Sequence, residues 1–391
     1  MAKVRKRTLP SGLVRWQAGY VDGAGERRFK LFERKSDAEA WLVETRHDLA
    51  RGLHTPGSVS PTMKEAAALW IKRCNEKGLE PTTVRGYEEH VDLHIVPFIG
   101  MKKAAEMTVP TINGFADQLR DAGRSTVMIK KVVGSVGSIF KELRRRGLAN
   151  TAPTAGIDLD LGDDDREDPR PIIPTKPELQ AIIAGCIDRW RPVILVAIFC
   201  GLRASELRGL TWSNVDLDAR QLTLTQRADA FHRIGKLKSR TAYRSVPCPS
   251  LVLNALREWK LKCPKGDLSL VFPNGIGKVE SHSNLLERGL HPILVAAGIT
   301  ELAPVLDEAG KPILNNASEP ITREVPKYGM HSLRHACASL WIESGYNPKQ
   351  IQRLMGHSSI KVTFDIYGHL FADAEADQRA AENVQIRLLG A

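Results

Sequence analysis

Apolar and polar residues alternate along residues 13–21 and again along residues 27–33. A two-residue period of this kind predicts β-strands, and residues 22–25 between them are typical of a tight turn. A helix should follow, because Ser36 and Glu39 have the spacing of a capping box in front of an apolar face. The start of the chain therefore predicts a small α+β unit.

Beyond residue 61 the apolar residues recur with the period of a helix. Thr62 and Glu65 repeat the capping-box spacing, and further helices are expected around Val84 and after Thr108. The fourth helix should be the longest, because Ser125 can cap a run whose apolar residues all face inward. This pattern predicts a small helical bundle.

The next change is an acidic stretch at residues 158–171, which contains three consecutive aspartates and two prolines. Such a composition cannot bury a core, so an extended hinge is expected there. The remainder is mostly helical in pattern, with strand-like residues at 222–226 and 244–247 around a basic middle. Residues 300–327, with several prolines, look like an inserted loop or hairpin.

Taken together, these patterns predict a multidomain protein that is mainly α-helical with small β-sheets. A chain of 391 residues is also too long for one ordinary core. The expected parts are an α+β domain at residues 1–55, a linker rich in Gly, Pro and Ser at 52–61, a helical domain at 61–157, the hinge at 158–171 and a mixed α/β domain at 172–391.

Composition narrows the class of partner. The chain has 56 Lys and Arg against 45 Asp and Glu, a net charge of +11, which favours a polyanion such as nucleic acid over a membrane surface or an acidic protein. No apolar run reaches the roughly 18 residues of a membrane span. The six cysteines lack the close spacing of a zinc or redox site. We expect a soluble protein of the bacterial cytoplasm and nucleoid, with no metal, cofactor or membrane partner.

Local signals in the last part of the chain suggest chemistry, although each is weak alone. Arg203 at a helix start fits a simple cap paired with Glu206. His331 and Arg334 have the i, i+3 spacing that puts two side chains on one helical face. His335, the next residue, is as consistent with packing against the helix behind it as with chemistry. These histidines do not form a zinc motif, because no HExxH helix or cysteine partner accompanies them.

The order of these signals is more informative than any one of them. A helix end at Gly356 should be followed by an exposed imidazole at His357, and Tyr367 comes ten residues later, where a lone tyrosine would usually be packing. The ordered set resembles the tyrosine recombinase or phage integrase family, with residues 61–157 placed like its core-site-binding domain, a SAM-like bundle, and residues 1–55 like its arm-type DNA-binding domain. The matching residues are Arg203, Glu206, Lys238, His331, Arg334, His335, His357 and Tyr367.

The resemblance implies that Tyr367 attacks a DNA phosphate and forms a covalent 3′-phosphotyrosyl intermediate. Arg203 and Arg334 would neutralise the transition state, because guanidinium groups bind phosphate oxygens in a bidentate way. Two arginines and a lysine around the phosphate should also favour the phenolate of Tyr367, whose ordinary pKa is about 10.

Roles for the other residues stay less defined. His331 and His357 can donate hydrogen bonds to the phosphate or help to remove the tyrosine proton, because imidazole titrates near neutral pH. His335 is a supporting residue, as is Glu206. Lys238, on the hairpin, would be the general acid for the leaving oxygen, although Lys236 is a nearby alternative.

The partners implied are double-stranded DNA at core and arm attachment sites, a homotetramer on two duplexes, and a host DNA-bending or directionality factor, for a prophage or other mobile element. A type IB topoisomerase and a non-catalytic architectural protein are the alternatives. The tail beyond Gly368, with Val384, Ile386 and Leu388, would dock on a neighbouring subunit or pack within its own. Phosphate contacts are expected from Lys130, Lys131, Arg144, Arg145 and Arg146, unless these only form a solvated face.

Overall fold

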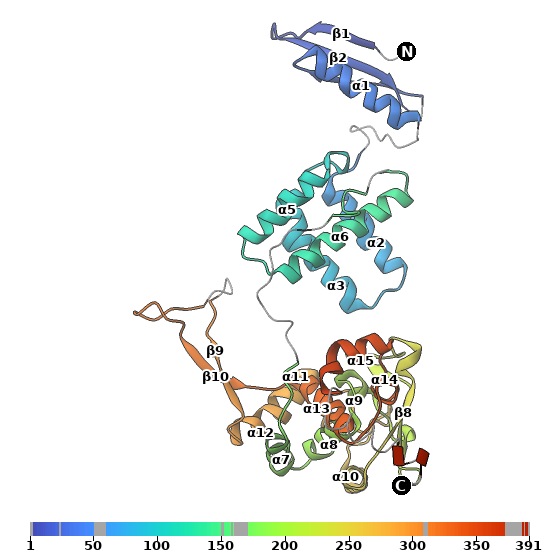
Figure 1. The fold of residues 1–391 in the computed structure, drawn as a ribbon, viewed down its shortest axis with the longest axis vertical. Coiled ribbons are helices and arrows are strands. Elements are labelled where there is room, and N and C mark those ends of the chain that lie inside the picture. Colours follow the sequence, from blue (N-terminus) through green and yellow to red (C-terminus); the bar gives the residue numbers. More distant parts are fainter. Residues whose placement is uncertain are drawn as a thin grey trace. The chain divides into compact units, whose positions relative to one another are not determined.

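The computed structural model describes residues 3–22, 25–50, 60–149, 152–157, 159, 171–307, 312–371, 385, 386, 388 and 389. The chain divides into two compact units, Met1–Arg166 and Glu167–Ala391 (Figure 1). Several sequence predictions fall outside the described residues, namely the centre of the first turn, most of the linker at 52–61, most of the hinge at 158–171, and Val384.

The chain begins with a three-stranded antiparallel sheet, β1 (Lys3–Thr8), β2 (Val14–Val21) and β3 (Arg27–Phe32), joined in the order β1-β2-β3. Helix α1 (Lys35–Ala50) packs on it, and Ala18, Tyr20, Ala38 and Leu42 form the core between them. Strands β2 and β3 confirm the prediction. Strand β1 was not predicted, because its mostly basic and exposed residues carry no apolar period.

The capping box predicted at Ser36 is wrong. Helix α1 begins one residue earlier, at Lys35, so Ser36 lies inside the first turn. Its hydroxyl donates a hydrogen bond to the carboxylate of Asp37 at 3.2 Å instead of accepting one from the backbone. The local pattern identified the helix correctly but misplaced its start, since hydrogen bonds between neighbouring polar side chains compete with capping.

The helical bundle of the first unit confirms the caps predicted at Thr62 and Ser125 and the helix predicted after Thr108. The capping box at Thr62 and Glu65 is present, Thr108 accepts from Thr111 N, and Ser125 accepts from Met128 N. A turn of π-helix at Val91–Ile95 separates the second and third helices of the bundle, and residues 104–106 form a 3₁₀ turn. The helices are α2 (Met63–Glu76), α3 (Pro81–His90), α4 (Val96–Ile99), α5 (Val109–Asp121) and α6 (Thr126–Arg145).

The second unit is built around helix α8 (Trp190–Cys200), whose residues 192–198 are all buried. Helices α10 (Ser250–Lys262) and α13 (Met330–Glu343) pack against it. The capping box predicted at Thr175 and Glu178 is present. The other helices are α7 (Lys176–Gly185), α9 (Ala204–Gly209), α11 (His282–Asn284), α12 (His291–Ala296), α14 (Pro348–Met355) and α15 (Ile360–Tyr367), with a π turn at Leu285–Leu290 and 3₁₀ turns at Trp212–Asn214, Arg240–Ala242 and Gly368–Leu370.

Small antiparallel sheets complete this unit. The predicted hairpin is present as β5 (Gln221–Leu224) and β8 (Arg244–Pro247), in a sheet of order β4-β5-β8 that adds β4 (Val215–Asp216). A minor pair, β6 (Arg227–Ala228) and β7 (Ile234–Gly235), lies between them in the sequence. The predicted insertion is a hairpin, β9 (Thr300–Pro304) with β10 (Thr322–Pro326), which extends away from α12 (Figure 1).

Two negative findings hold for the described residues. None of their helices is both long and apolar enough to span a membrane. They also contain no cluster of three or more His, Cys, Asp or Glu side chains able to hold a metal ion. All six cysteines are free, and all except Cys263 are buried.

Candidate active site

Two glycines end helices beside the candidate site and turn the chain sharply. Gly201, after α8, and Gly356, after α14, both adopt the left-handed conformation, with φ of 62° and 63°. A side chain would be crowded at either place, since a Cβ on Gly356 would lie 2.9 Å from Nη1 of Arg244. Glycine avoids both the strain and the clash. Because of these turns Arg203 and His357 lie close together, and Nη2 of Arg203 donates a hydrogen bond to the backbone oxygen of Gly356.

Arg334 joins the ends of these two helices from α13. Its side chain is 2% exposed, and its two terminal nitrogens donate hydrogen bonds to the backbone oxygens of Gly201 and Met355. Burial, together with the charge of Arg203, lowers the pKa of Arg334 to about 9. It remains a cation at neutral pH, so it is both a structural clamp and a buried positive charge.

Glu206 compensates the arginines of the site. Its carboxylate accepts two hydrogen bonds from Arg203, one from the backbone N at 2.8 Å and one from Nη1 at 2.9 Å. Arg244 binds the same carboxylate in a bidentate way, at 3.0 and 2.9 Å. Burial alone would raise the pKa of Glu206, but these cations outweigh it and lower the pKa to about 2.

Arg244 is a member of the site that the sequence analysis missed. It is the first residue of β8 and its side chain is 3% exposed. Its Nε donates to the backbone oxygen of Leu354 at 2.6 Å, which ties the strand to the end of α14. The sequence predicted that Arg244 begins a strand. No local pattern could show that its side chain is buried beside Glu206.

Tyr367, the last residue of α15, is almost fully buried, with 1% of its surface exposed. Its hydroxyl forms a 2.7 Å hydrogen bond with Nδ1 of His335. Burial raises the pKa of Tyr367 above its ordinary value, although Arg334 and Arg203 act in the opposite direction. The two arginines therefore favour the phenolate, as expected, but in the DNA-free protein desolvation outweighs them.

Three histidines form a cluster with Tyr367, and His335 is the one that contacts its hydroxyl group. The ring of His331 meets that of His335 edge to face, with centroids 4.5 Å apart, and the ring of His357 lies nearly parallel to that of Tyr367 at 6.2 Å. Nδ1 of His357 is 3.0 Å from Oγ1 of Thr363. His357 is only 6% exposed, so the prediction of an exposed imidazole is wrong. The tight glycine turn directs the ring inward.

The histidines are uncharged at neutral pH. Burial lowers the pKa of His357 to about 3 and that of His335 to about 4, and nearby positive charges such as Arg334 add to the effect. His331 is more exposed than the other two, but its partial desolvation and the charges of Arg334 and Arg203 also lower its pKa. The expected titration near neutral pH does not hold for the DNA-free protein, but neutral imidazoles can accept a proton.

The structure brings most of the predicted residues together but leaves the lysine apart. Lys238 and Lys236 are both exposed, on the segment between β7 and the turn at Arg240–Ala242. The backbone oxygen of Lys236 accepts a hydrogen bond from Nε of Arg227 at 3.1 Å. The residues that converge are Arg203, Glu206, His331, Arg334, His335, His357 and Tyr367.

The basic residues predicted to contact phosphates at α6 and its C-terminal end differ in whether they already form ion pairs within the protein. Lys130, Lys131 and Arg144 are exposed. Arg145 and Arg146 are exposed too, but both bind the buried carboxylate of Glu142, at 2.7 and 2.6 Å. The hydrogen bonds from Arg145 lower the pKa of Glu142 to about 2 against the opposing effect of burial. Part of the charge of these two arginines is thus compensated internally.

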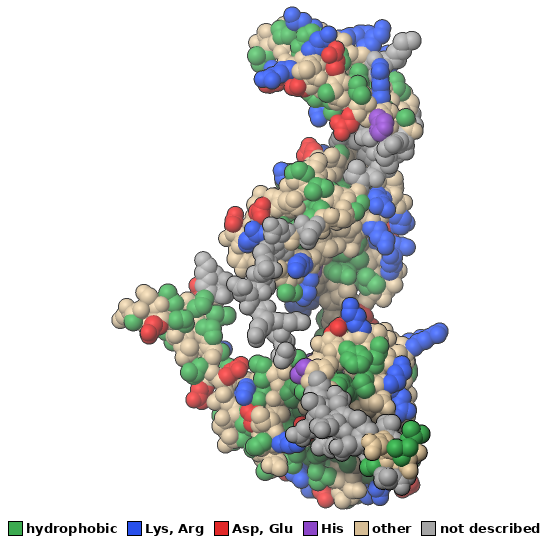
Figure 2. Space-filling view, in the orientation of Figure 1, with side chains coloured by type: hydrophobic (Ala, Val, Ile, Leu, Met, Phe, Trp, Pro, Cys, Tyr) green, Lys and Arg blue, Asp and Glu red, His purple; other side chains and the backbone are tan. Residues whose placement is uncertain are grey.

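Basic side chains also gather elsewhere. Strand β1 exposes Lys3, Arg5, Lys6 and Arg7, and Figure 2 shows Lys and Arg side chains over the N-terminal sheet (Figure 2). At the other end of the chain, Leu370 and Phe371 pack against the cluster that contains Tyr367, while Ile386 and Leu388 are exposed. The beginning of the tail thus packs within its own unit.

Comparisons with known proteins identify the family to which the chain belongs. Residues 175–373 match the phage integrase family, and residues 5–51 match the phage integrase N-terminal domain. The chain is 24% identical to a tyrosine recombinase XerC-like protein of Caldanaerobacter subterraneus subsp. tengcongensis over 86% of each chain. It is also 24% identical to a putative prophage phiRv2 integrase of Mycobacterium tuberculosis, over 91% of this chain and 88% of the relative.

Solved structures show the same fold. The Tn1549 transposon integrase, in complex with a circular intermediate DNA, superposes with a TM-score of 0.63 at 20% identity, over 84% of this chain and all of that one. A lambda integrase dimer bound to a core site superposes with a TM-score of 0.55 at 16% identity, over 94% of each chain. The predicted fold class, multidomain and mainly helical with small sheets, is confirmed.

Fold and site together define a DNA strand-exchange enzyme of the tyrosine type. The chain belongs to the phage integrase family. It is a site-specific tyrosine recombinase, an enzyme that cleaves and rejoins DNA through a tyrosine intermediate.

Proposed function

We propose that Tyr367 is the nucleophile of this recombinase. Its oxygen attacks the phosphorus of a DNA phosphodiester, a bond forms between tyrosine and the 3′ phosphate, and the 5′ oxygen leaves. The proposal rests on one observation, the cluster that Arg203, Arg334 and three histidines form around Tyr367, whose hydroxyl contacts His335. Because the phosphate ester is conserved in the tyrosine link, the 5′ hydroxyl of a DNA end can reverse the step without ATP.

The surrounding side chains have different proposed roles in this step. Arg203 and Arg334 neutralise the charge that develops on the non-bridging oxygens. His335 forms a hydrogen bond with the phenol and has a neutral ring, so it is suited to accept the proton as the bond to phosphorus forms. In this proposal His331 and His357 donate hydrogen bonds to the phosphate, and their membership of the cluster around Tyr367 supports that role.

Lys238 is the proposed general acid for the 5′ oxygen. It is exposed on the segment that leads into β8, and β8 carries Arg244 into the site. DNA binding would bring that segment over the phosphate, where an ammonium group can give up its proton. Lys236 lies on the same segment and is the alternative general acid. The single variants Lys238→Met and Lys236→Met should therefore be compared on a substrate with a 5′-thiolate leaving group. Such a leaving group needs no acid, so it should restore cleavage to the variant that lacks the general acid.

A nicked core-site duplex tests the nucleophile, because loss of the short cleaved strand traps the covalent adduct. We expect an adduct with the wild-type protein and with Tyr328→Phe, and none with Tyr367→Phe. Tyr328 is a matched control, since it is 3% exposed and its hydroxyl also forms a hydrogen bond, with Glu178 at 2.9 Å. An adduct from Tyr367→Phe would reject the assignment.

The wider setting is proposed on the same basis. A lambda integrase tetramer bound to a Holliday junction superposes on this chain with a TM-score of 0.53 at 17% identity, and the Tn1549 structure holds a circular intermediate. We propose a homotetramer on two duplexes that integrates or excises a mobile element in the bacterial cytoplasm, assisted by a host or directionality factor. Residues 1–55 would bind arm sites, 61–157 and 172–391 core sites, and 158–171 would be the hinge.

A further inference from the structure

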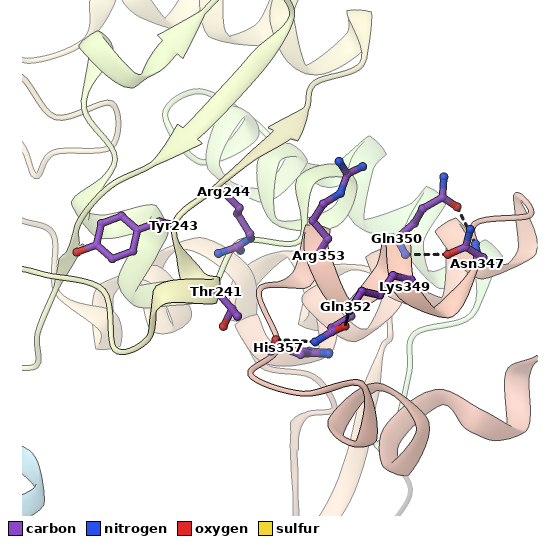
Figure 3. Close-up of a pocket in the computed structure, with 9 residues that line it drawn as sticks. All are labelled: Thr241, Tyr243, Arg244, Asn347, Lys349, Gln350, Gln352, Arg353 and His357. Atoms are coloured by element: carbon purple, nitrogen blue, oxygen red, sulfur yellow. Dashed lines mark hydrogen bonds between the residues drawn. The ribbon is translucent and has the colours of Figure 1, made fainter.

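A hollow of about 460 Å³ opens beside the candidate active site. Figure 3 shows its two sides, with the residues around the start of β8 facing those of α14 and the loop before it (Figure 3). The residues that line it are Thr241, Tyr243, Arg244, Asn347, Lys349, Gln350, Gln352, Arg353 and His357. We call it the α14 hollow.

The charge of the α14 hollow is entirely positive. Its lining residues include three cations and no carboxylate. Arg244 is neutralised from behind by Glu206, but Lys349 and Arg353 are exposed on α14. Nζ of Lys349 binds only the neutral amide of Gln352, at 2.8 Å, and the Arg353 side chain has no ion pair among the described residues. Two cations therefore face the hollow uncompensated, which favours an anionic occupant.

The α14 hollow is continuous with the catalytic cluster. His357 belongs to both, since its ring stacks beside Tyr367 and also lines the hollow. Arg203 reaches the same wall, where its Nη2 donates to the backbone oxygen of Gly356 at 3.1 Å. A DNA strand carries a phosphate at every nucleotide, spaced about 3.4 Å apart along the axis. A strand with one phosphate at the arginines must therefore place its neighbour close by.

We infer that the α14 hollow is a second phosphate subsite, which holds the phosphodiester next to the cleaved one on the same strand. This inference rests on the proposed function, because it needs the cleaved phosphate to lie beside Tyr367. Lys349 and Arg353 bind the neighbouring phosphate. The ring of Tyr243, which is 45% exposed, packs against the attached sugar or base. The subsite fixes the register of the strand, so that the correct phosphorus faces the nucleophile.

Neutral methylphosphonate linkages test the subsite one phosphate at a time. The duplex carries a single methylphosphonate at either neighbour of the cleaved phosphate, and its binding and cleavage are compared with those of unmodified DNA. The full-length variant is Lys349→Gln with Arg353→Gln. Its matched control is Arg257→Gln with Lys262→Gln, which removes the same charge from exposed positions on α10. All four positions are exposed, so the substitutions should leave folding intact.

In the wild type and the control, methylphosphonate at one neighbouring position should weaken binding and lower cleavage. In the α14 variant the same linkage should have no further effect, because the partner of that phosphate is already missing. The slope of log Kd against log salt should also fall by about one in this variant and less in the control, as expected for one lost phosphate contact.

Additive effects of variant and linkage at both neighbours would overturn the subsite. So would a variant that binds single sites normally but fails to assemble higher complexes, because the hollow would then take a protein segment. The wild-type adduct on unmodified DNA separates the two proposals. Additive effects with an adduct that depends on Tyr367 reject the subsite alone, whereas an adduct that survives in Tyr367→Phe rejects the nucleophile.

Discussion

At the scale of single residues, Arg334 shows how the site combines structure with chemistry. Two of its five N–H donors hold the backbone oxygens of Gly201 and Met355. A buried cation is costly without compensation, and the nearby carboxylate of Glu206 supplies it. In the proposed mechanism the same guanidinium binds phosphate oxygens. Because its two backbone contacts already fix its position, it would need little rearrangement to stabilise the transition state.

The depressed pKa of His357 predicts a loss of stability in acid. The unfolded chain takes up a proton on this ring near its ordinary pKa of about 6.5, whereas the folded chain takes it up only near pH 3. Between these values the unfolded state binds more protons, so stability is complete above the upper pKa and falls as the pH falls. The free energy of unfolding should drop by about 2 kcal/mol between about pH 6.5 and about pH 5 from this group alone.

Urea unfolding at the two pH values, followed by hydrogen exchange of the α13 amides, measures that drop. His357→Asn is the control, because its amide can keep the contact with Thr363 but does not titrate. The drop should be smaller in this variant by the contribution of His357. Other histidines with lowered pKa values, such as His335, contribute to both proteins alike. Equal drops in the two proteins would contradict the buried, neutral state of His357.

At the scale of elements, the sequence predicted best where one local interaction decides the structure. The capping boxes at Thr62 and Thr175 are present because both partners are three residues apart. Strand β1 was missed because its stability comes from pairing with β2, which no period in its own residues reveals. Arg244 was missed for the same reason, since its partner Glu206 is 38 residues away.

The turn at Gly356 supports a prediction about α14. In Gly356→Ala the left-handed φ of 63° costs about 1 kcal/mol or more, and the new Cβ would lie 2.9 Å from Nη1 of Arg244 and 3.1 Å from the backbone oxygen of Thr241. One of these groups must move. We expect lower stability and a loss of adduct formation of at least about tenfold, since small displacements of catalytic groups are costly.

Gly345→Ala is the matched control for this strain. Gly345 also has a positive φ, of 84°, but a Cβ there would meet nothing within 4 Å. Thermal unfolding and adduct yield should be measured for both variants. Both should unfold earlier than the wild type, and only Gly356→Ala should form less adduct at a temperature where both are folded. Similar adduct yields would show that the crowding against Arg244 does not matter for the site.

At the scale of the whole molecule, the candidate chemistry is confined to the second unit. The residues that converge on Tyr367 all lie between 203 and 367, and their hydrogen bonds are formed within the second unit. The N-terminal sheet has its own core with α1 and exposes a basic strand, β1. The sequence could predict this division, because each part has its own pattern, but the partner of each part depends on surfaces that assemble only in the fold.

Removal of residues 1–55 should therefore separate cleavage from integration. The shortened protein keeps the helical bundle and every residue of the candidate site, so adduct formation on a nicked core-site duplex should be close to that of the full chain. Integration between two complete attachment sites should fall strongly, because the arm contacts proposed for these residues would be lost.

A full-length variant with Arg5→Glu and Lys6→Glu on β1 should behave in the same way, since both side chains are exposed and the sheet register does not depend on them. Undiminished integration by both proteins would contradict a DNA-binding role for the N-terminal sheet. Loss of the core-site adduct in the truncated protein would show that cleavage depends on residues 1–55.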